Sequence, residues 1–353
     1  MKKLSFIVLC LLLPFLLFTA CPEDNPSKQN QTQDENQQGQ GPQDTVKHEK
    51  PYVSGANLVD KDGNKLQLYG MSTHGIAWYP DYVNFETFKT LHDDWKTNCI
   101  RLAMYTAESG GYCSGGDKEN LKKIIKKGVD AATQLGMYVI IDWHVLNENP
   151  SKKPRNGDPN FYKKEAKSFF DEMSKLYKDN ENVLYEICNE PNGSDITWDV
   201  VKEYANDIIP VIRGNSPDSI ILVGTPTWSQ DIHKASESPL EFKNIMYSLH
   251  FYAGTHKDSL RKRLDDYVSK GLPVFVDEFA ICTADGNGKN DLESGRLWLE
   301  LIKKHNLSFM AWNLSDKAES SSILKNKKLS GWTDDDLTEW GKWIKDKFQN
   351  AGK

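Results

Sequence analysis

The sequence predicts an α/β protein folded as a closed (β/α)8 barrel over residues 51–353 of a 353-residue chain. Short apolar runs alternate with amphipathic helical patterns, which is typical of β-α-β units and a parallel sheet. Eight such runs occur in about 300 residues, and eight strands suit a closed barrel better than an open sheet of five or six. Polar side chains fall at the ends of these runs, and in a barrel those ends meet at one mouth.

The predicted strands are the apolar runs, such as "MYVIIDWH" at 137–144, and in chain order they span 66–72, 98–105, 137–144, 183–190, 219–225, 245–252, 273–279 and 307–315. The predicted helices have apolar residues at helical spacing and span 84–95, 117–136, 159–179, 198–214, 260–271, 292–306 and 334–348. The link after the fifth strand is the weakest, because 228–236 would form only a short helix.

The first residues predict an export signal rather than part of the fold. Two lysines precede an apolar core from Leu4 to Phe18, and the small residues Thr19 and Ala20 come directly before Cys21. The apolar core is short and interrupted by proline, which disfavours a permanent membrane span. A cysteine after small residues resembles a bacterial lipoprotein box, so we expect residues 1–20 to be removed and Cys21 lipidated. Plain secretion is the alternative.

The next segment, 21–50, is rich in glutamine and has almost no aliphatic side chains, so we expect a disordered linker between the anchor and the barrel. The net charge of -6 gives no basic surplus, which argues against a nucleic-acid partner. We therefore expect a monomeric bacterial lipoprotein at the cell surface or in the periplasm, which contacts the membrane only through its lipid.

The cysteines predict no metal centre. Cys99 and Cys188 lie in apolar runs, where a thiol behaves as a small hydrophobe. Cys113 and Cys282 lie in loop-like sequence, and export would permit a disulfide, so they are the pair to test. The chain has no CxxC or Cys/His spacing for a structural ion, and we expect neither a metal nor another cofactor.

Two acids are the candidate reacting groups, Glu190 at the end of the fourth strand and Glu278 at the end of the seventh. Strands four and seven of a barrel face each other across the mouth. Glycoside hydrolysis uses such a pair, and carboxyl groups about 5–5.5 Å apart give retention of configuration. Glu278 would be the ionised nucleophile, with Arg101 and Tyr252 lowering its pKa, and Glu190 the acid/base. Asn189 could bond the sugar 2-hydroxyl.

The remaining polar strand ends support this hypothesis as a group. A single glutamate at a strand end is more often a solvated terminus, and a single histidine is more often a satisfied core residue. Six polar strand ends together favour a site; Arg101 is one of these strand-end residues, and the further members are Tyr105, Asp142, His144, His250 and Trp312.

Tryptophans supply candidate sugar platforms, because a flat aromatic face suits the C–H face of a pyranose. Trp78, Trp228 and Trp312 fall after strands and fit this role. Four others lie in helical patterns and are expected in the core, namely Trp95, Trp298, Trp340 and Trp343. Trp143 fits either role.

The segment "VLYEICNEPNGSDITW" resembles the acid/base segment of glycoside hydrolase family 5, and "PVFVDEF" resembles its nucleophile strand. In the same order, "GMSTHGIAWYP", "IRLAMYT", "VIIDWHVL", "VGTPTWSQD", "LHFYAGTH" and "MAWNLSDKAESSSIL" resemble other segments of its bacterial endo-β-1,4-glucanase branch. The sequence departs from the family where Phe279 and Ala280 follow Glu278 in place of Trp-Gly.

The resemblance implies the site position by position. Glu190 would be the proton donor and Glu278 the nucleophile, supported by Arg101, His144, Asn189, His250 and Tyr252. Trp312 would lie under the sugar that is attacked. Tyr105 is a further substrate-contact candidate from its strand end. On the glycone side the resemblance places His74, Trp78, Lys317 and Glu319, and near the leaving group it places Trp228.

The hypothesis is therefore an exported, retaining endo-β-1,4-glucanase acting on cellulose or mixed-linkage β-glucan. A β-mannanase or xyloglucanase on the same barrel is the first alternative, and a non-catalytic glycan-capture lipoprotein is the second. A metal-dependent hydrolase using Asp142, His144 and His250 is conceivable, although no spacing demands an ion.

Overall fold

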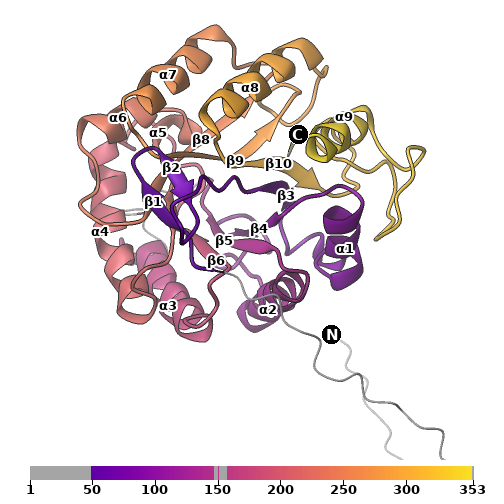
Figure 1. Cartoon of the computed structure of the whole chain (residues 1–353). Helices are drawn as coiled ribbons and strands as arrows, with labels where there is room; N and C mark the ends of the chain where they lie inside the picture. Colours follow the sequence, from indigo (N-terminus) through magenta and orange to yellow (C-terminus); the bar gives the residue numbers. More distant parts are fainter. Residues whose placement is uncertain (1–48, 147–149, 151–156, 352–353) are drawn as a thin grey trace, which may run out of the picture. The chain divides into compact units, whose positions relative to one another are not determined.

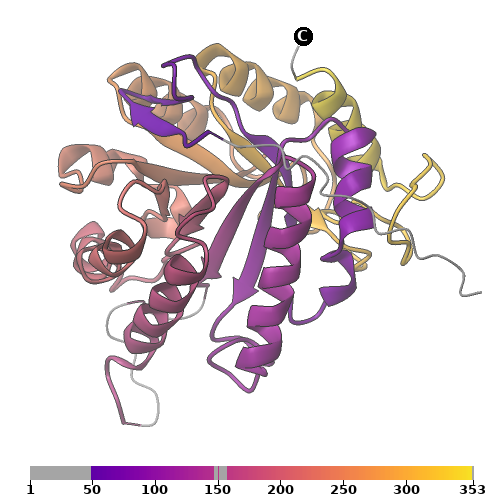
Figure 2. The same ribbon diagram turned by 60° about the horizontal axis from the view of Figure 1, so that its bottom comes forward.

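The computed structural model describes residues 49–146, 150 and 157–351. In this part of the chain, parallel strands close into a barrel in the order β10-β3-β4-β5-β6-β7-β8-β9 (Figures 1 and 2). This confirms the predicted (β/α)8 fold, and each predicted strand run contributes one strand. The strands are β3 (Tyr69–Thr73), β4 (Cys99–Tyr105), β5 (Tyr138–His144), β6 (Val183–Glu186), β7 (Ile221–Val223), β8 (Ile245–Tyr252), β9 (Val274–Ala280) and β10 (Phe309–Leu314).

Helices surround the barrel where the amphipathic patterns predict them (Figure 1). They are α1 (Phe85–Asp93), α2 (Lys118–Gln134), α3 (Phe161–Leu176), α4 (Trp198–Asn215), α7 (Asp258–Ser269), α8 (Leu292–His305) and α9 (Glu339–Gln349). The weak link after β7 holds two short helices, α5 (Pro226–Ser229) and α6 (Ile232–Glu237), and a 3-10 turn, η1, covers Pro80–Tyr82. Polar caps fix several starts: the side chains of Asp117 and Thr197 accept backbone N–H bonds at the first turns of α2 and α4.

A short antiparallel hairpin precedes the barrel and was not predicted. It consists of β1 (Tyr52–Ser54) and β2 (Asn57–Val59), whose three-residue strands are too short to give a periodic signal. Leu58 of the hairpin packs in one cluster with Leu68, Cys99 and other residues from the N-terminal ends of the barrel strands. The hairpin therefore covers the end of the barrel opposite the mouth.

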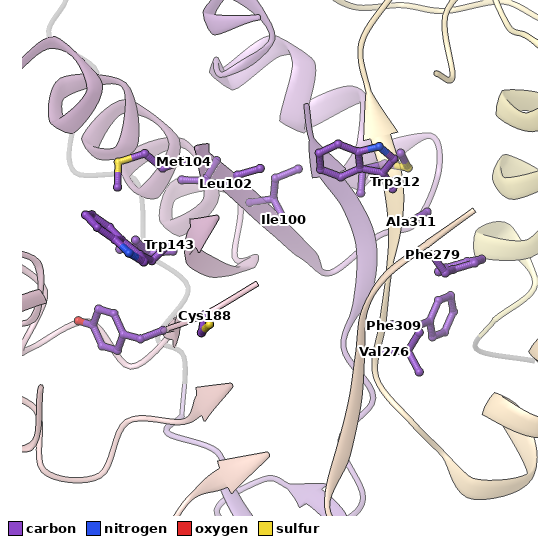
Figure 3. Close-up of a cluster of buried hydrophobic side chains, with 14 of the residues drawn as sticks. Ile100, Leu102, Met104, Trp143, Cys188, Val276, Phe279, Phe309, Ala311 and Trp312 are labelled. Atoms are coloured by element: carbon purple, nitrogen blue, oxygen red, sulfur yellow. The ribbon is translucent and has the colours of Figure 1, made fainter. Parts of the chain in front are cut away.

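The larger apolar core lies between the strands and the helices, and Figure 3 shows part of it. Outward-facing Ile100, Leu102 and Met104 alternate along β4 with inward-facing residues, as the two-residue period of a strand requires. Trp143, which the sequence left open, is a core residue: it is buried, and its ring centroid lies 5.1 Å from that of Phe169 on α3. Trp95, Trp298 and Trp340 are also fully buried, and the partly buried Trp343 stacks on Trp340.

Several predictions concern the N-terminal segment, which lies almost wholly outside the described residues. These are the export signal over 1–20, the lipidation of Cys21 and the linker over 21–50, of which only residues 49–50 are described. Within the described ranges, no helix is both long enough and apolar enough to cross a bilayer. Cys113 and Cys282 are both buried, and no disulfide joins these two described residues.

Candidate active site

Arg101 is the centre of a buried polar network inside the barrel. We predicted it at a strand end, but it is the third residue of β4 and lies inside the barrel, below the mouth, with no solvent exposure. Its Nε and Nη2 each donate to one oxygen of Glu186 at 2.7 Å. Nη2 also donates to Asn189 Oδ1 at 2.6 Å and lies 3.0 Å from Asp142 Oδ2. One planar cation thus fixes side chains from three neighbouring segments.

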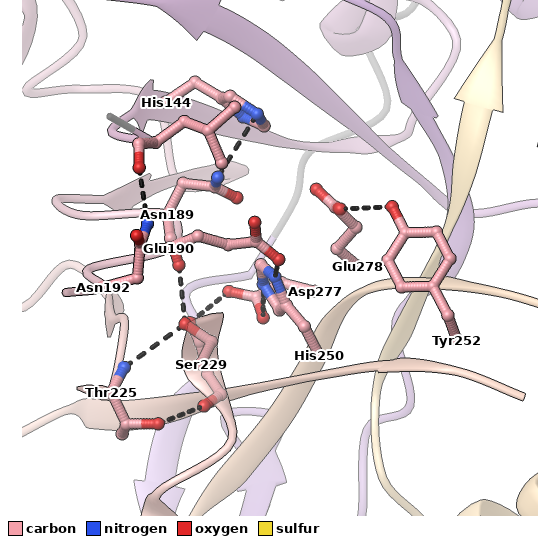
Figure 4. A network of polar contacts seen from close by, with 12 residues as sticks. His144, Asn189, Glu190, Asn192, Thr225, Ser229, His250, Tyr252, Asp277 and Glu278 are labelled. Atoms are coloured by element: carbon pink, nitrogen blue, oxygen red, sulfur yellow. Dashed lines mark hydrogen bonds and ion pairs between the residues drawn. The ribbon is translucent and has the colours of Figure 1, made fainter. Parts of the chain in front are cut away.

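Glu278 is held as an ionised carboxylate by two neighbours. Arg101 Nη1 lies 3.1 Å from its Oε2. The hydroxyl of Tyr252 donates to its Oε1 at 2.8 Å (Figure 4). Burial raises the pKa of Glu278, but the positive charges of His250 and Arg101 outweigh burial and bring the pKa below its ordinary 4.5. The structure therefore contains the contacts that the sequence predicts for a nucleophile.

Glu190 was predicted at the end of a strand, but in the structure it lies four residues beyond the end of β6. Strand β6 stops at Glu186, because β7 is only three residues long and pairs with it over two positions. The chain continues in an irregular segment tied to its neighbours, with Glu190 N donating to Val145 O at 3.0 Å. Pro191 follows, and having no N–H it cannot extend the pairing. The carboxyl group of Glu190 still points toward His250 and Glu278 (Figure 4).

The two glutamates are close and are tuned in opposite directions. One oxygen of Glu190 and one of Glu278 lie within 4.8 Å of one another. Burial and the negative charge of Glu278 raise the pKa of Glu190, and a 2.9 Å contact with His250 Nδ1 only partly offsets them. One carboxyl group is therefore poised to hold a proton and the other to lose it, which is the division that acid/base and nucleophile roles require.

His144 forms a second arm of the network. Its Nδ1 lies 2.6 Å from Asp142 Oδ2, and Asn189 Nδ2 lies 3.2 Å from its Nε2. Because an amide N–H can only donate, Nε2 accepts and the ring proton is on Nδ1. Burial and Arg101 lower the pKa of His144 well below its ordinary value, so the ring is neutral.

The predicted glycone-side residues form a continuous wall beside this network. The rings of His74 and Trp312 have centroids 5.2 Å apart, and Tyr105 packs against both His144 and Trp78 at 4.0 and 4.7 Å. Trp78 is 40% exposed, so its face is open to a ligand.

Two charged residues complete the wall. Lys317 Nζ lies 2.6 Å from Glu319 Oε2, and Asn313 Nδ2 donates to Glu319 Oε1 at 2.9 Å. Burial and the charge of Lys317 lower the pKa of His74 to about 3, which keeps its ring neutral beside them.

Trp228 stands on the opposite side of Glu190, on a strained turn. Thr227, Trp228 and Ser229 all have left-handed backbone conformations, with φ of 59°, 52° and 54°. Ser229 Oγ donates to Asn189 O at 2.6 Å and so ties the turn to the Glu190 segment. The exposed fraction of Trp228 is 47%, and it lines a cavity of about 450 Å³ together with Glu190. Strain of about 1–2 kcal/mol per residue is typical of functional turns.

The structure thus gathers the predicted catalytic and substrate-contacting side chains at the C-terminal mouth or, for Arg101, just below it, while the individual roles stay predictions. Sequence reasoning missed two buried acids, Glu186 and Asp277. The available signal was an acid inside an apolar run, since a buried charge needs a partner. Glu186 has Arg101, and Asp277 Oδ1 lies 3.1 Å from His250 Nε2.

Two groups of described side chains have atoms near enough to share an ion: Glu186, His250 and Asp277, and Glu190, His250 and Glu278. Both depend on His250, whose ring nitrogens contact Asp277 and Glu190. The metal-dependent alternative would use Asp142, His144 and His250 as ligands, but these three side chains do not form one cluster. Asp142 pairs with His144, whereas His250 contacts Glu190 and Asp277. The ring nitrogens of His250 thus already contact protein carboxylates, whereas Asp142 Oδ1 is buried without a hydrogen-bond partner among the described residues.

Comparison with known proteins places the chain among cellulases. The family model described as Cellulase (glycosyl hydrolase family 5) matches residues 59–318. Endoglucanase A of Butyrivibrio fibrisolvens is 50% identical over 301 residues, which cover 84% of this chain and 68% of that protein. An endoglucanase of Clostridium saccharobutylicum is 47% identical over 297 residues, covering 83% and 63%. The chain thus spans 63–68% of the length of these two relatives.

Among solved structures, the catalytic domain of Thermobifida fusca endoglucanase Cel5A in complex with cellotetraose superimposes with a TM-score of 0.78. It is 36% identical, and the match covers 85% of this chain and 97% of that one.

Proposed function

Because the chain belongs to glycosyl hydrolase family 5, we propose that it is a retaining endo-β-1,4-glucanase that cleaves internal bonds of cellulose or mixed-linkage β-glucan. One observation carries the proposal: two glutamates with oppositely shifted pKa values have oxygens within 4.8 Å of each other. Such a close approach suits direct attack by one carboxylate, whereas the carboxyl groups of inverting enzymes stand about 6.5–9.5 Å apart to admit a water. The names of the relatives, which are endoglucanases, supply the substrate class.

The proposed reaction has two steps, formation of a covalent glycosyl ester and its hydrolysis. An oxygen of ionised Glu278 bonds to the anomeric carbon while the C–O bond to the leaving sugar breaks. The electron pair of that bond goes to the leaving oxygen, which takes the proton of Glu190. Water then attacks the anomeric carbon, Glu190 takes its proton, and the electron pair of the ester bond returns to Glu278.

The flanking residues suit a chain bound across the bond that is cleaved. Trp78, Trp312 and Tyr105 provide aromatic faces on one side of the glutamates, and Trp228 provides one on the other. Aromatic contacts on both sides fit an internal bond of a long glycan, because an enzyme acting only on chain ends needs one side closed.

The test replaces Glu190 and Glu278 separately by glutamine. Each variant should lose hydrolysis of carboxymethylcellulose by at least about 10²–10⁴-fold, because a glutamine can neither hold the required charge nor transfer the proton. Glu293→Gln on the exposed face of α8 is the matched control and should keep full activity. Full activity in either site variant would sink the proposal. Product sizing on glucan, mannan and xyloglucan separates this function from the alternative hydrolases, and binding without cleavage would indicate a capture protein.

We also propose that the protein is an exported lipoprotein anchored through Cys21, with the barrel on a linker. The support is the order of lysines, apolar core and small residues over 1–21. A Cys21→Ser chain should then leave the membrane fraction, and unchanged membrane association would reject the anchor.

A further inference from the structure

Strand β9 carries an extra residue next to the nucleophile. On its β8 side, Ser248 and His250 are two residues apart but pair with Phe275 and Glu278, which are three apart. The pairing of β9 with β10 shifts over the same stretch. This is a β-bulge, a feature that re-aims side chains near active sites. Regular alternation would turn Asp277 out of the barrel if Glu278 points in, whereas the bulge buries both, with Asp277 at 0% exposure.

The bulge places Asp277 behind the acid/base candidate. Its Oδ1 lies 3.1 Å from His250 Nε2, and the other ring nitrogen, Nδ1, lies 2.9 Å from Glu190 Oε1. The hydroxyl of Ser248 donates to Asp277 Oδ2 and holds the carboxylate in place. Figure 4 shows Glu190, His250 and Asp277 as one chain of contacts.

We propose that Asp277 is a positioning residue for the acid/base step, which acts by fixing the ring of His250 and the proton on its Nε2. The inference rests on the proposed function, in which Glu190 is the acid/base. The logic is that of a buried carboxylate behind a catalytic histidine, which selects the tautomer and stabilises the protonated ring. Asp277 does not reach the substrate itself.

The consequence for Glu190 follows from the two nitrogens of one ring. With the Nε2 proton bound by Asp277, the raised pKa of His250 keeps a second proton on Nδ1, which the ring donates to the carboxyl group of Glu190. An asparagine at 277 has no negative charge to stabilise the protonated ring. Glu190 would then lose the charged donor that orients its carboxyl group.

The direction of the pH effect can also be derived. Burial lowers the pKa of His250, but Asp277 and Glu190 outweigh it and raise the pKa well above its ordinary value. The protonated ring in turn lowers the pKa of Glu190. Removing the charge of Asp277 should therefore neutralise His250 and let the pKa of Glu190 rise, so that the acid stays protonated to higher pH.

Other ionisable groups face His250 and Glu190 and remain unchanged in an Asp277 variant. They come from β4, β5, β6, β8, β9 and the turn after β8, and they are Arg101, Tyr105, Asp142, His144, Glu186, Tyr252, Glu278 and His256. A shift in the pH profile would thus report on the charge at position 277.

The experiment compares Asp277→Asn with the unsubstituted chain on two cellobiosides, one of phenol and one of 2,4-dinitrophenol. The dinitrophenolate leaves without protonation, whereas phenol needs the acid. The kcat/KM of the variant should fall about 10–100-fold on the phenyl substrate. Its fall on the dinitrophenyl substrate should be smaller by a factor of at least about ten. The alkaline limb of kcat/KM should move up by about one pH unit or more.

Two variants keep the test decisive. Ser248→Ala leaves every carboxylate in place and should show the same pattern more weakly, which covers the case in which Asp277→Asn does not fold. Ser308→Ala removes a buried hydroxyl that accepts from Leu68 N at 2.9 Å near the opposite end of the barrel, and its pH profile should be unchanged. Equal losses on both substrates with an unmoved alkaline limb would overturn the inference. An unsubstituted chain without hydrolysis would instead reject the proposed function.

Discussion

The barrel interior has two layers that lie only two residues apart along each strand and differ completely in chemistry. The lower layer is apolar and includes Cys99, Ile140, Leu184, Met246, Phe275 and Met310. Two residues further on, four of these strands turn Arg101, Asp142, Glu186 and Ser248 inward, and β9 adds Asp277. Because side chains alternate along a strand, a step of two residues keeps the same face and changes only the height in the barrel.

The difference separates stability from chemistry. The lower layer contributes through the removal of apolar surface from water and through close packing. The upper layer buries several carboxylates around Arg101 and two histidines, an arrangement that costs desolvation energy and that apolar residues could replace without loss of stability. Such an expensive layer is expected where function requires it.

Arg101→Met should give the largest effect and should damage both properties, because it is the one change that leaves the upper layer uncompensated. Ionised Glu278 and the carboxyl groups of Glu186 and Asp142 would remain buried without the guanidinium group that binds them, which costs about 3–5 kcal/mol in the free energy of unfolding. Activity on carboxymethylcellulose should fall at least about a hundredfold as Glu278 loses its position. Urea denaturation measures the first effect. Arg296→Met on the exposed face of α8 is the control and should change stability by less than about 0.5 kcal/mol.

Met310→Ala in the lower layer should separate the two properties. Truncating a buried methionine leaves a cavity and costs about 2–5 kcal/mol in the free energy of unfolding. Below the new midpoint of unfolding, kcat should stay within about twofold, because no polar contact of the site is touched. If kcat fell tenfold while stability held, the division of the barrel into two layers would be wrong.

Asp142→Asn should change stability by an amount that depends on pH. Burial raises the pKa of Asp142 to about 8, although Arg101 opposes this, so between its unfolded value of 3.8 and about 8 the folded chain holds a proton that the unfolded chain releases. The stability that this proton contributes is present at low pH and is lost as pH rises through that window. Asparagine carries no such proton. As pH rises through the window, the free energy of unfolding of the variant relative to the unsubstituted chain should therefore increase by on the order of 1 kcal/mol per pH unit.

Thermal unfolding at pH 5 and pH 8 checks this linkage. Met310→Ala serves as the matched comparison, since its loss should be the same at both values. Parallel curves for Asp142→Asn and the unsubstituted chain would contradict a raised pKa.

The sequence was sufficient for the order of the barrel strands, and insufficient for the depth at which a side chain lies in the barrel. Apolar runs and helical periods are local signals, so each of the barrel strands was predictable. Arg101 was predicted at the mouth because a run of letters does not show how far above the barrel floor a residue sits. Asp277 was missed because alternation counted back from inward-facing Glu278 turns it outward, and only the pairing of β9 with both neighbours reveals the extra residue. The signal, the lipidation of Cys21 and the linker stay predictions, because residues 1–48 lie outside the described part of the chain.

The closure of the barrel has a consequence for how the chain must fold. Strand β3 pairs with β10, and the bond from Leu68 N to Ser308 Oγ next to these strands spans 240 residues. Contacts between residues this distant in sequence form only after a large loss of chain entropy. We therefore expect closure of the barrel to be a late and slow step of folding. Until β10 arrives, β3 and β9 are open edge strands able to pair with another chain. A chain cut before Phe309 should therefore aggregate, even though it would retain both glutamates.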